Sequence, residues 1–325
     1  MQNSINRYYL YYTHALKDKH THEELTSKLK EKFGLSSECI SIKQLGRHRH
    51  FDSIIISGND ILFAIPLESK DEILERYNVK LSLGESLFET HQWILPPFVA
   101  KKDVLKLALT PIGQEALELF EKIYSTEVIV RQIKGTYIKI PEFKSYIHLI
   151  IEAIESYYLA HIASSITLLL TVIEGISREF CDNNLIKYNK SGSTSAFQSV
   201  MKNQKLLWRN KVLFKDKYTL PADYYDDLFL RRVDEGMDLL ITYENYGLEY
   251  LYKSNSKHPL NRHTILHGTN KSFFIDINFY RLYSCLEALA FAVSLNPFYY
   301  GAEESGEALE LLMRFEKLRH IKSVL

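Results

Sequence analysis

The chain has 325 residues, of which 46% are hydrophobic, and it carries 22 tyrosines and 17 phenylalanines. This is enough for one large domain or two ordinary ones, and it is too aromatic for a disordered protein. Because 40 basic residues balance 40 acidic ones, we exclude a protein that coats nucleic acid through its whole surface, and any contact with nucleic acid must be local.

The cysteines and the apolar runs indicate the compartment. The three cysteines form no CxxC pair, which argues against a disulfide framework or a thiolate zinc site. The N-terminus has no apolar stretch of signal-peptide length, and the longest apolar run, residues 162–176, is too short for a membrane span. No glycine-rich nucleotide loop and no GxSxG elbow occurs. We therefore expect a cytoplasmic protein without a membrane partner and without a cofactor.

Residues 1–98 are expected to form the smaller, mixed α/β domain, with a sensing, regulatory or partner-binding role. Helical spacing predicts a helix over residues 23–33 that stops at Gly34. Residues 52–67 predict a hairpin, because two apolar runs flank a Ser-Gly-Asn-Asp turn. One or two further strands are predicted within residues 81–95, and Pro96-Pro97 then marks the boundary.

Residues 99–140 are expected to connect this domain to the next. A helix is predicted to begin near Thr110-Pro111, since Thr is a good N-cap and Pro is tolerated at the first helical position. Residues 127–140 alternate and contain Lys134-Gly135, which predicts a short hairpin that ends at Pro141.

Residues 141–325 are expected to form an all-α bundle. Apolar residues at spacings of three and four predict helices over residues 147–158 and 162–180. The pattern predicts three more helices, at residues 223–250, 272–295 and 303–321. The fold class is therefore α+β, with a helical C-terminal domain.

The segment Asn261-Arg262-His263-Thr264-Ile265-Leu266-His267-Gly268 lies between a predicted helix end and a predicted helix start. RNA carries its own nucleophile, the 2′-hydroxyl. Its cleavage needs a group that moves protons near neutral pH, which suits histidine, and a cation that stabilises the phosphorane, which suits arginine. We expect His267 to move protons and Arg262 to stabilise the phosphate, without a metal.

This segment also resembles a known family. Arg262-x4-His267, with a polar residue directly after the arginine, is similar to the Arg-x(4–6)-His signature of HEPN-domain ribonucleases. The stretch AHIASSITLLLTVIEGISREF resembles the long helix of those domains, and the resemblance covers about residues 141–296. It implies a HEPN-like bundle acting as a metal-independent endoribonuclease, of the toxin–antitoxin or abortive-infection type, in antiviral defence.

The same resemblance implies partners. The active site of such ribonucleases forms at a homodimer interface where two Arg–His pairs face one another, and a trigger protein or an antitoxin controls some members. Some HEPN toxins have a tyrosine two residues after the motif histidine, which an antitoxin modifies. Thr269 stands at that position, which argues against neutralisation by that route.

Three residues are expected to support the pair. His263 occupies the polar position after the arginine, and Asn261 is placed to orient the pair. Glu174 corresponds to the acid found on the long helix of many family members. It sits in an otherwise apolar turn, so burial would demand a partner, for which Arg178 and Arg262 are the candidates.

Two basic segments without any acid, residues 183–215 and 251–275, are the candidate RNA contacts. The tract at residues 191–195 favours a mobile loop in the first, and a solvated loop that happens to be basic is the alternative. Trp208 in this segment is expected to anchor a core rather than to stack on a base. The RNA-binding residues expected from the two segments are Lys205, Arg209, Lys257 and Lys271.

Other classes of function stay open. The chain could be a non-catalytic HEPN-like scaffold that binds nucleotide, RNA or a protein partner, with Arg262 and His267 as structural loop residues. A metal-dependent hydrolase could use histidines such as those at residues 14–22 and 47–50, although solvated surface is the simpler interpretation. His263 and His267 are spaced like zinc ligands, but no HExxH pattern and no third ligand accompany them.

Overall fold

The computed structural model describes most of the chain. The described residues are 2–16, 20–47, 50–58, 62–76, 87–95, 99, 101–192, 194–215, 218–252, 258–296 and 305–324. Within them the architecture is α+β, as predicted, with one small sheet near the N-terminus and helices elsewhere. No helix of this part of the chain is both long and apolar enough to cross a membrane.

The chain folds into two compact units. Unit 1 comprises Met1–Leu81 with Lys205–Asp238, and unit 2 comprises Ser82–Gln204 with Leu239–Leu325. This grouping differs from the expected division at residues 98 and 140. The segment Lys205–Asp238, which was expected in the helical bundle, belongs to the unit of the N-terminal sheet instead.

Unit 1 is built on a four-stranded sheet in the order β1-β2-β3-β4. Its elements are α1 (Gln2–Leu16), α2 (His22–Phe33), η1 (Ser37–Cys39), β1 (Ile40–Leu45), β2 (Phe51–Ser57), β3 (Leu62–Pro66), α3 (Lys70–Arg76), η3 (Trp208–Leu213), β4 (Tyr218–Thr219), η4 (Ala222–Tyr225) and α12 (Asp227–Val233). The predicted hairpin is confirmed, since β2 pairs with β3 in antiparallel register, Ile55 opposite Ala64. The predicted helix at residues 23–33 is also confirmed: it is α2, and it ends at Gly34, whose φ is 63°.

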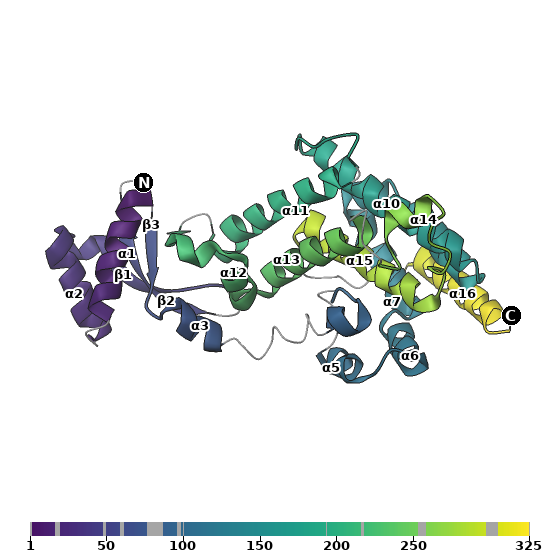
Figure 1. The fold of residues 1–325 in the computed structure, drawn as a ribbon, viewed down its shortest axis with the longest axis horizontal. Coiled ribbons are helices and arrows are strands. Elements are labelled where there is room, and N and C mark those ends of the chain that lie inside the picture. Colours follow the sequence, from purple (N-terminus) through teal and green to yellow (C-terminus); the bar gives the residue numbers. More distant parts are fainter. Residues whose placement is uncertain are drawn as a thin grey trace. The chain divides into compact units, whose positions relative to one another are not determined.

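The two-residue alternation along β2 sends side chains to both faces of the sheet. Ile54 and Ile56 pack with Leu25 and Leu29 of α2 in one hydrophobic core, and Figure 1 shows α1 and α2 beside these strands. Toward the other face, the ring of Phe51 lies edge-on to Phe229 of α12, 5.8 Å between centroids.

The segment of unit 1 that comes late in the chain is held by a strand and a tryptophan. β4 pairs with β3 in parallel, Leu62 opposite Tyr218. Trp208 is fully buried, as expected, and its indole N–H donates to Asp234 Oδ1 over 2.7 Å. The same oxygen accepts the N–H of Met237. Asp234 thereby interrupts the single helix predicted over residues 223–250.

Unit 2 is helical, and α15 runs through its core. Its elements are α5 (Lys101–Leu109), α6 (Gln114–Ile123), α7 (Thr126–Gly135), η2 (Tyr137–Lys139), α8 (Pro141–Lys144), α9 (Ile147–Tyr158), α10 (Ile162–Asn183), η5 (Leu248–Tyr252), α14 (Arg262–Leu266), α15 (Asp276–Ser294) and α16 (Gly306–Lys322). The boundary between the units falls inside α11 (Ser195–Leu207) and α13 (Glu235–Gly247). Every residue of α15 from Ile277 to Val293 is buried, and α9, α10 and α14 belong to the same unit.

Several sequence predictions in unit 2 were wrong. Residues 127–140 form α7 and η2 rather than a hairpin, because Ile129, Val130 and Ile133 share one buried helical face. Thr110 follows the end of α5 instead of capping a helix, and its hydroxyl donates to Lys106 O. Within the predicted strand region at 81–95, residues 87–91 are helical, and residues 81–86 lie outside the described part of the chain.

Candidate functional site

The Arg–His motif lies on α14, a short helix that a buried asparagine begins. Asn261 is fully buried, and its side-chain oxygen accepts the N–H of Thr264 over 3.2 Å. The Thr264 hydroxyl donates back to the carbonyl of Asn261 over 2.9 Å. Asn261 is therefore the N-cap of α14, which orients the motif through the backbone.

A glycine turn ends the same helix. The N–H of His267 donates to His263 O over 3.1 Å, and that of Gly268 donates to Ile265 O over 3.0 Å. Gly268 has a φ of 69°, in the left-handed region that favours glycine. The chain therefore turns sharply after His267.

The two histidines of the motif lie side by side and exposed. The ring centroids of His263 and His267 are 4.3 Å apart, because the residues are one helical turn apart. In the described residues, no three His, Cys, Asp or Glu side chains gather in a way that could hold a metal ion.

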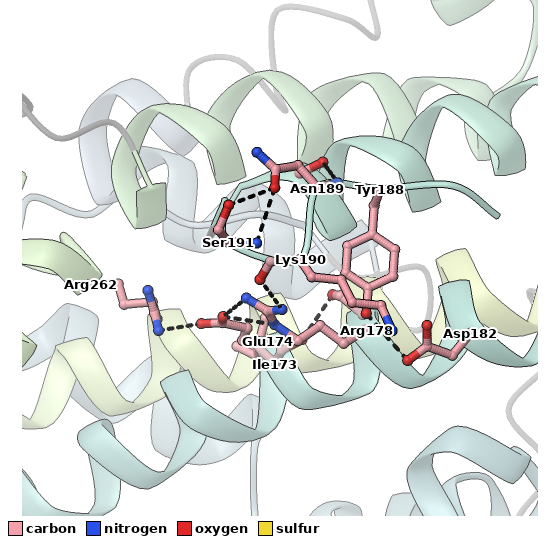
Figure 2. Close-up of polar contacts among 11 residues, drawn as sticks. Ile173, Glu174, Arg178, Asp182, Tyr188, Asn189, Lys190, Ser191 and Arg262 are labelled. Carbon is pink, nitrogen blue, oxygen red and sulfur yellow. Dashed lines mark hydrogen bonds and ion pairs between the residues drawn. The ribbon is translucent and has the colours of Figure 1, made fainter.

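The side chain of Arg262 reaches α10. Its Nη2 forms an ion pair with Oε2 of Glu174, a carboxylate whose side chain is only 12% exposed. Oε1 of Glu174 accepts two hydrogen bonds from Arg178, from Nε over 3.0 Å and from Nη2 over 2.7 Å. Both arginines expected as partners of Glu174 therefore contact it, one on each oxygen (Figure 2).

Arg178 also holds the loop that follows α10. Its Nη1 donates to Lys190 O over 3.0 Å, and its guanidinium carbon lies 5.9 Å from the centre of the Tyr188 ring. In the same loop, Asn189 accepts hydrogen bonds from the N–H and the hydroxyl of Ser191. The mobile loop was expected at residues 191–195; the first of these, Ser191, belongs to a hydrogen-bonded turn that Arg178 joins to α10.

The charges of this cluster do not cancel. One carboxylate lies between two guanidinium groups, which leaves one positive charge in excess. Hydrogen bonds from Arg178 to Glu174 raise the pKa of that guanidinium above its ordinary value. Tyr252 of η5 is buried beside this cluster. Its burial, and to a smaller extent the charge of Glu174, raises the pKa of its phenol, so Tyr252 adds no charge.

The other residues expected near the motif do not join this cluster in the described part of the chain. Arg262 and His267, expected as a catalytic pair, make no hydrogen bond with each other in the described residues. Lys271 is exposed on the connection between α14 and α15. Lys257 lies outside the described residues.

The other two expected RNA contacts belong to unit 1, whereas Arg262 and His267 belong to unit 2. Lys205 forms an ion pair with Asp227, 3.7 Å between charged atoms. The guanidinium of Arg209 lies over the Tyr225 ring, 4.7 Å from its centre. Both basic side chains therefore have protein partners of their own.

The histidine-rich stretches of unit 1 show ordinary contacts where they are described. His14 is exposed at the end of α1. His20 forms a pair with Glu24, 3.7 Å apart, and contacts Lys28. The side chain of His22 and residues 48–49 lie outside the described part of the chain.

The site also includes residues that the sequence did not single out. Lys190 contributes only its backbone carbonyl to Arg178, and Tyr252 comes from a π-helical segment. No motif marks either residue. Comparison of the chain with protein-family models, curated proteins and solved structures finds no match.

Proposed function

We propose that the protein is a metal-independent endoribonuclease whose half-site is the Arg262–Glu174–Arg178 cluster and the two histidines of α14. One observation carries the proposal: the short helix α14 and the residue that follows it bring an arginine and two histidines close together in the chain. Arg262 is anchored by the carboxylate of Glu174, and the imidazoles of His263 and His267 are exposed side by side. A cation for the phosphate and groups that exchange protons near pH 7 are what RNA cleavage requires.

The proposed reaction uses the substrate's own hydroxyl. His267, supported by His263, takes the proton of the 2′-hydroxyl, whose oxygen attacks the neighbouring phosphorus. The bond from phosphorus to the 5′-oxygen breaks, and that oxygen leaves with a proton from an imidazole. Arg262 stabilises the phosphorane charge. The products are a 2′,3′-cyclic phosphate and a 5′-hydroxyl.

The proposal extends to the assembly. Each chain carries one Arg262–His267 pair, and a homodimer would complete the site by bringing two such pairs together around a two-fold axis. As an RNA-degrading effector it would act in the cytoplasm, in antiviral defence or as a toxin, under an antitoxin or a trigger protein.

The test is cleavage of RNA by purified protein in EDTA. We expect 2′,3′-cyclic phosphate ends, and a loss of at least about a hundredfold in Arg262→Ala and in His267→Ala. His148→Ala is the matched control, because His148 is an exposed histidine of α9 outside the motif. Full cleavage by both motif variants would show that the assignment is wrong.

One observation favours a second candidate, a non-catalytic scaffold that binds nucleotide, RNA or a protein partner. Glu174 already engages the arginine that would act on the phosphate. Expression of the chain in cells separates the two functions. Toxicity that His267→Ala abolishes supports the ribonuclease, and toxicity that this variant leaves unchanged supports the scaffold.

A further inference from the structure

Glu174 poses an electrostatic problem for Arg262. A carboxylate paired with a single guanidinium forms a neutral unit, and the carboxylate then competes with any phosphate for the donors of that arginine. Here the carboxylate is shared. Arg178 makes two hydrogen bonds to Oε1, while Arg262 reaches only Oε2.

We infer that Arg178 is a positioning residue for the phosphate-binding function of Arg262. By compensating the charge of Glu174, it leaves the charge of Arg262 available to an RNA phosphate, and by occupying Oε1 it restricts Arg262 to the other oxygen. The inference rests on the proposed function, since it takes the ligand of Arg262 to be an RNA phosphodiester.

The surroundings of Arg178 keep it in this place. Its third nitrogen, Nη1, donates to Lys190 O over 3.0 Å, so all three guanidinium nitrogens of Arg178 are engaged. The side chain of Arg262 is 24% exposed and remains within reach of a ligand. Arg178 thus acts through Glu174, and its effect on RNA binding should require that carboxylate.

A double-mutant cycle tests this dependence, with binding of a fluorescent 2′-O-methyl RNA that cannot be cleaved. We expect Arg178→Met to weaken RNA binding about tenfold or more. The number of ions released on binding, measured from the slope of the affinity against salt concentration, should fall by about one. In a Glu174→Gln background, where no carboxylate charge needs compensation, the same change should alter affinity by less than about twofold. Arg178→Lys keeps the charge and should recover part of the affinity.

Arg131→Met is the matched control. Arg131 forms a pair with Glu127 at the same four-residue spacing, but that pair is exposed, 53% and 66%. This variant should bind like the wild type, and circular dichroism confirms that each variant is folded.

The outcomes separate the inference from the proposed function. Equal losses from Arg178→Met with and without the Glu174 carboxylate, or no loss at all, would overturn the inference while cleavage by the wild type still supports the ribonuclease. Wild-type protein that binds RNA with the expected cycle but never cleaves it would overturn the ribonuclease alone. Wild-type protein that does not bind RNA would overturn both.

Discussion

Replacing Glu287 by glutamine should stabilise the helical unit at neutral pH. Glu287 lies on α15 and is fully buried. Its Oε2 accepts a hydrogen bond of 2.7 Å from the side-chain amide of Gln132, and its Oε1 accepts one from the hydroxyl of Tyr137. Burial raises the pKa of this carboxyl well above its ordinary value of 4.5, because the interior disfavours the charged form more than these bonds favour it.

The sign of the effect follows from proton binding. Above pH 4.5, the unfolded chain has released the proton of this carboxyl while the folded chain still holds it. Stability therefore falls as pH rises, by about 1.4 kcal/mol per pH unit, until pH reaches the raised pKa of the folded state. An amide has no proton to release, so Glu287→Gln removes this loss.

The substitution can keep the network. The oxygen of the introduced amide can accept from Tyr137, and its nitrogen can donate to the side-chain oxygen of Gln132 if the Gln132 amide turns over. The hydroxyl of Tyr283, which donates to Gln132 Oε1 over 3.0 Å, can then accept a hydrogen bond instead.

Urea unfolding at pH 5, 6 and 7, followed by far-ultraviolet circular dichroism, measures the effect. The variant should gain stability relative to the wild type as pH rises through this range, by up to about 1.4 kcal/mol per pH unit. Glu127→Gln is the control, since Glu127 is exposed on α7 and the change removes a carboxylate without altering the buried network. A constant difference for Glu287→Gln across this range would refute the reasoning.

Three further changes have defined outcomes. Asn261→Ala removes the cap of α14 and should cost about 1 kcal/mol in thermal unfolding, whereas Asn261→Ser keeps a side-chain oxygen for the cap and should lose less. Gly236→Ala places a Cβ 2.3 Å from the buried ring of Trp208 and should cost about 1–3 kcal/mol in urea, whereas Gly306→Ala meets no atom within 4 Å and should be neutral. Gly268→Ala keeps a φ of 69° in open space, so it should lose about 1 kcal/mol through backbone strain alone, and Gly268→Asn should lose less.

Local patterns explain why some elements were predictable. In α2, Thr21 and Glu24 form a capping box and Gly34 ends the helix, so both ends are specified within a few residues. The hairpin of β2 and β3 follows from two apolar runs and a turn. By contrast, α7 carries β-branched residues that alternate like a strand, and its burial as a helix decides its structure.

The candidate site was predictable only in part. The sequence predicted that Arg262 and His267 lie between two longer helices, and they lie on the short helix α14 and at its C-terminal end. The direction of each side chain was not predictable: Arg262 turns inward and His267 outward, a difference that the packing of α14 against α10 decides.

Periodicity, capping and turn residues act over a few positions, so the amino-acid sequence was enough to predict the α+β class, most of the long helices, and the arginine and histidines of one short turn. Two arrangements are visible only in the three-dimensional fold: β4 joins a sheet formed far earlier in the chain, and Glu174 lies between Arg178 and Arg262. These pairings depend on burial and charge between distant segments. An acidic residue in an apolar helical stretch predicts that a buried carboxylate will pair with a basic side chain, but the sequence does not say which basic side chains lie close enough in the fold.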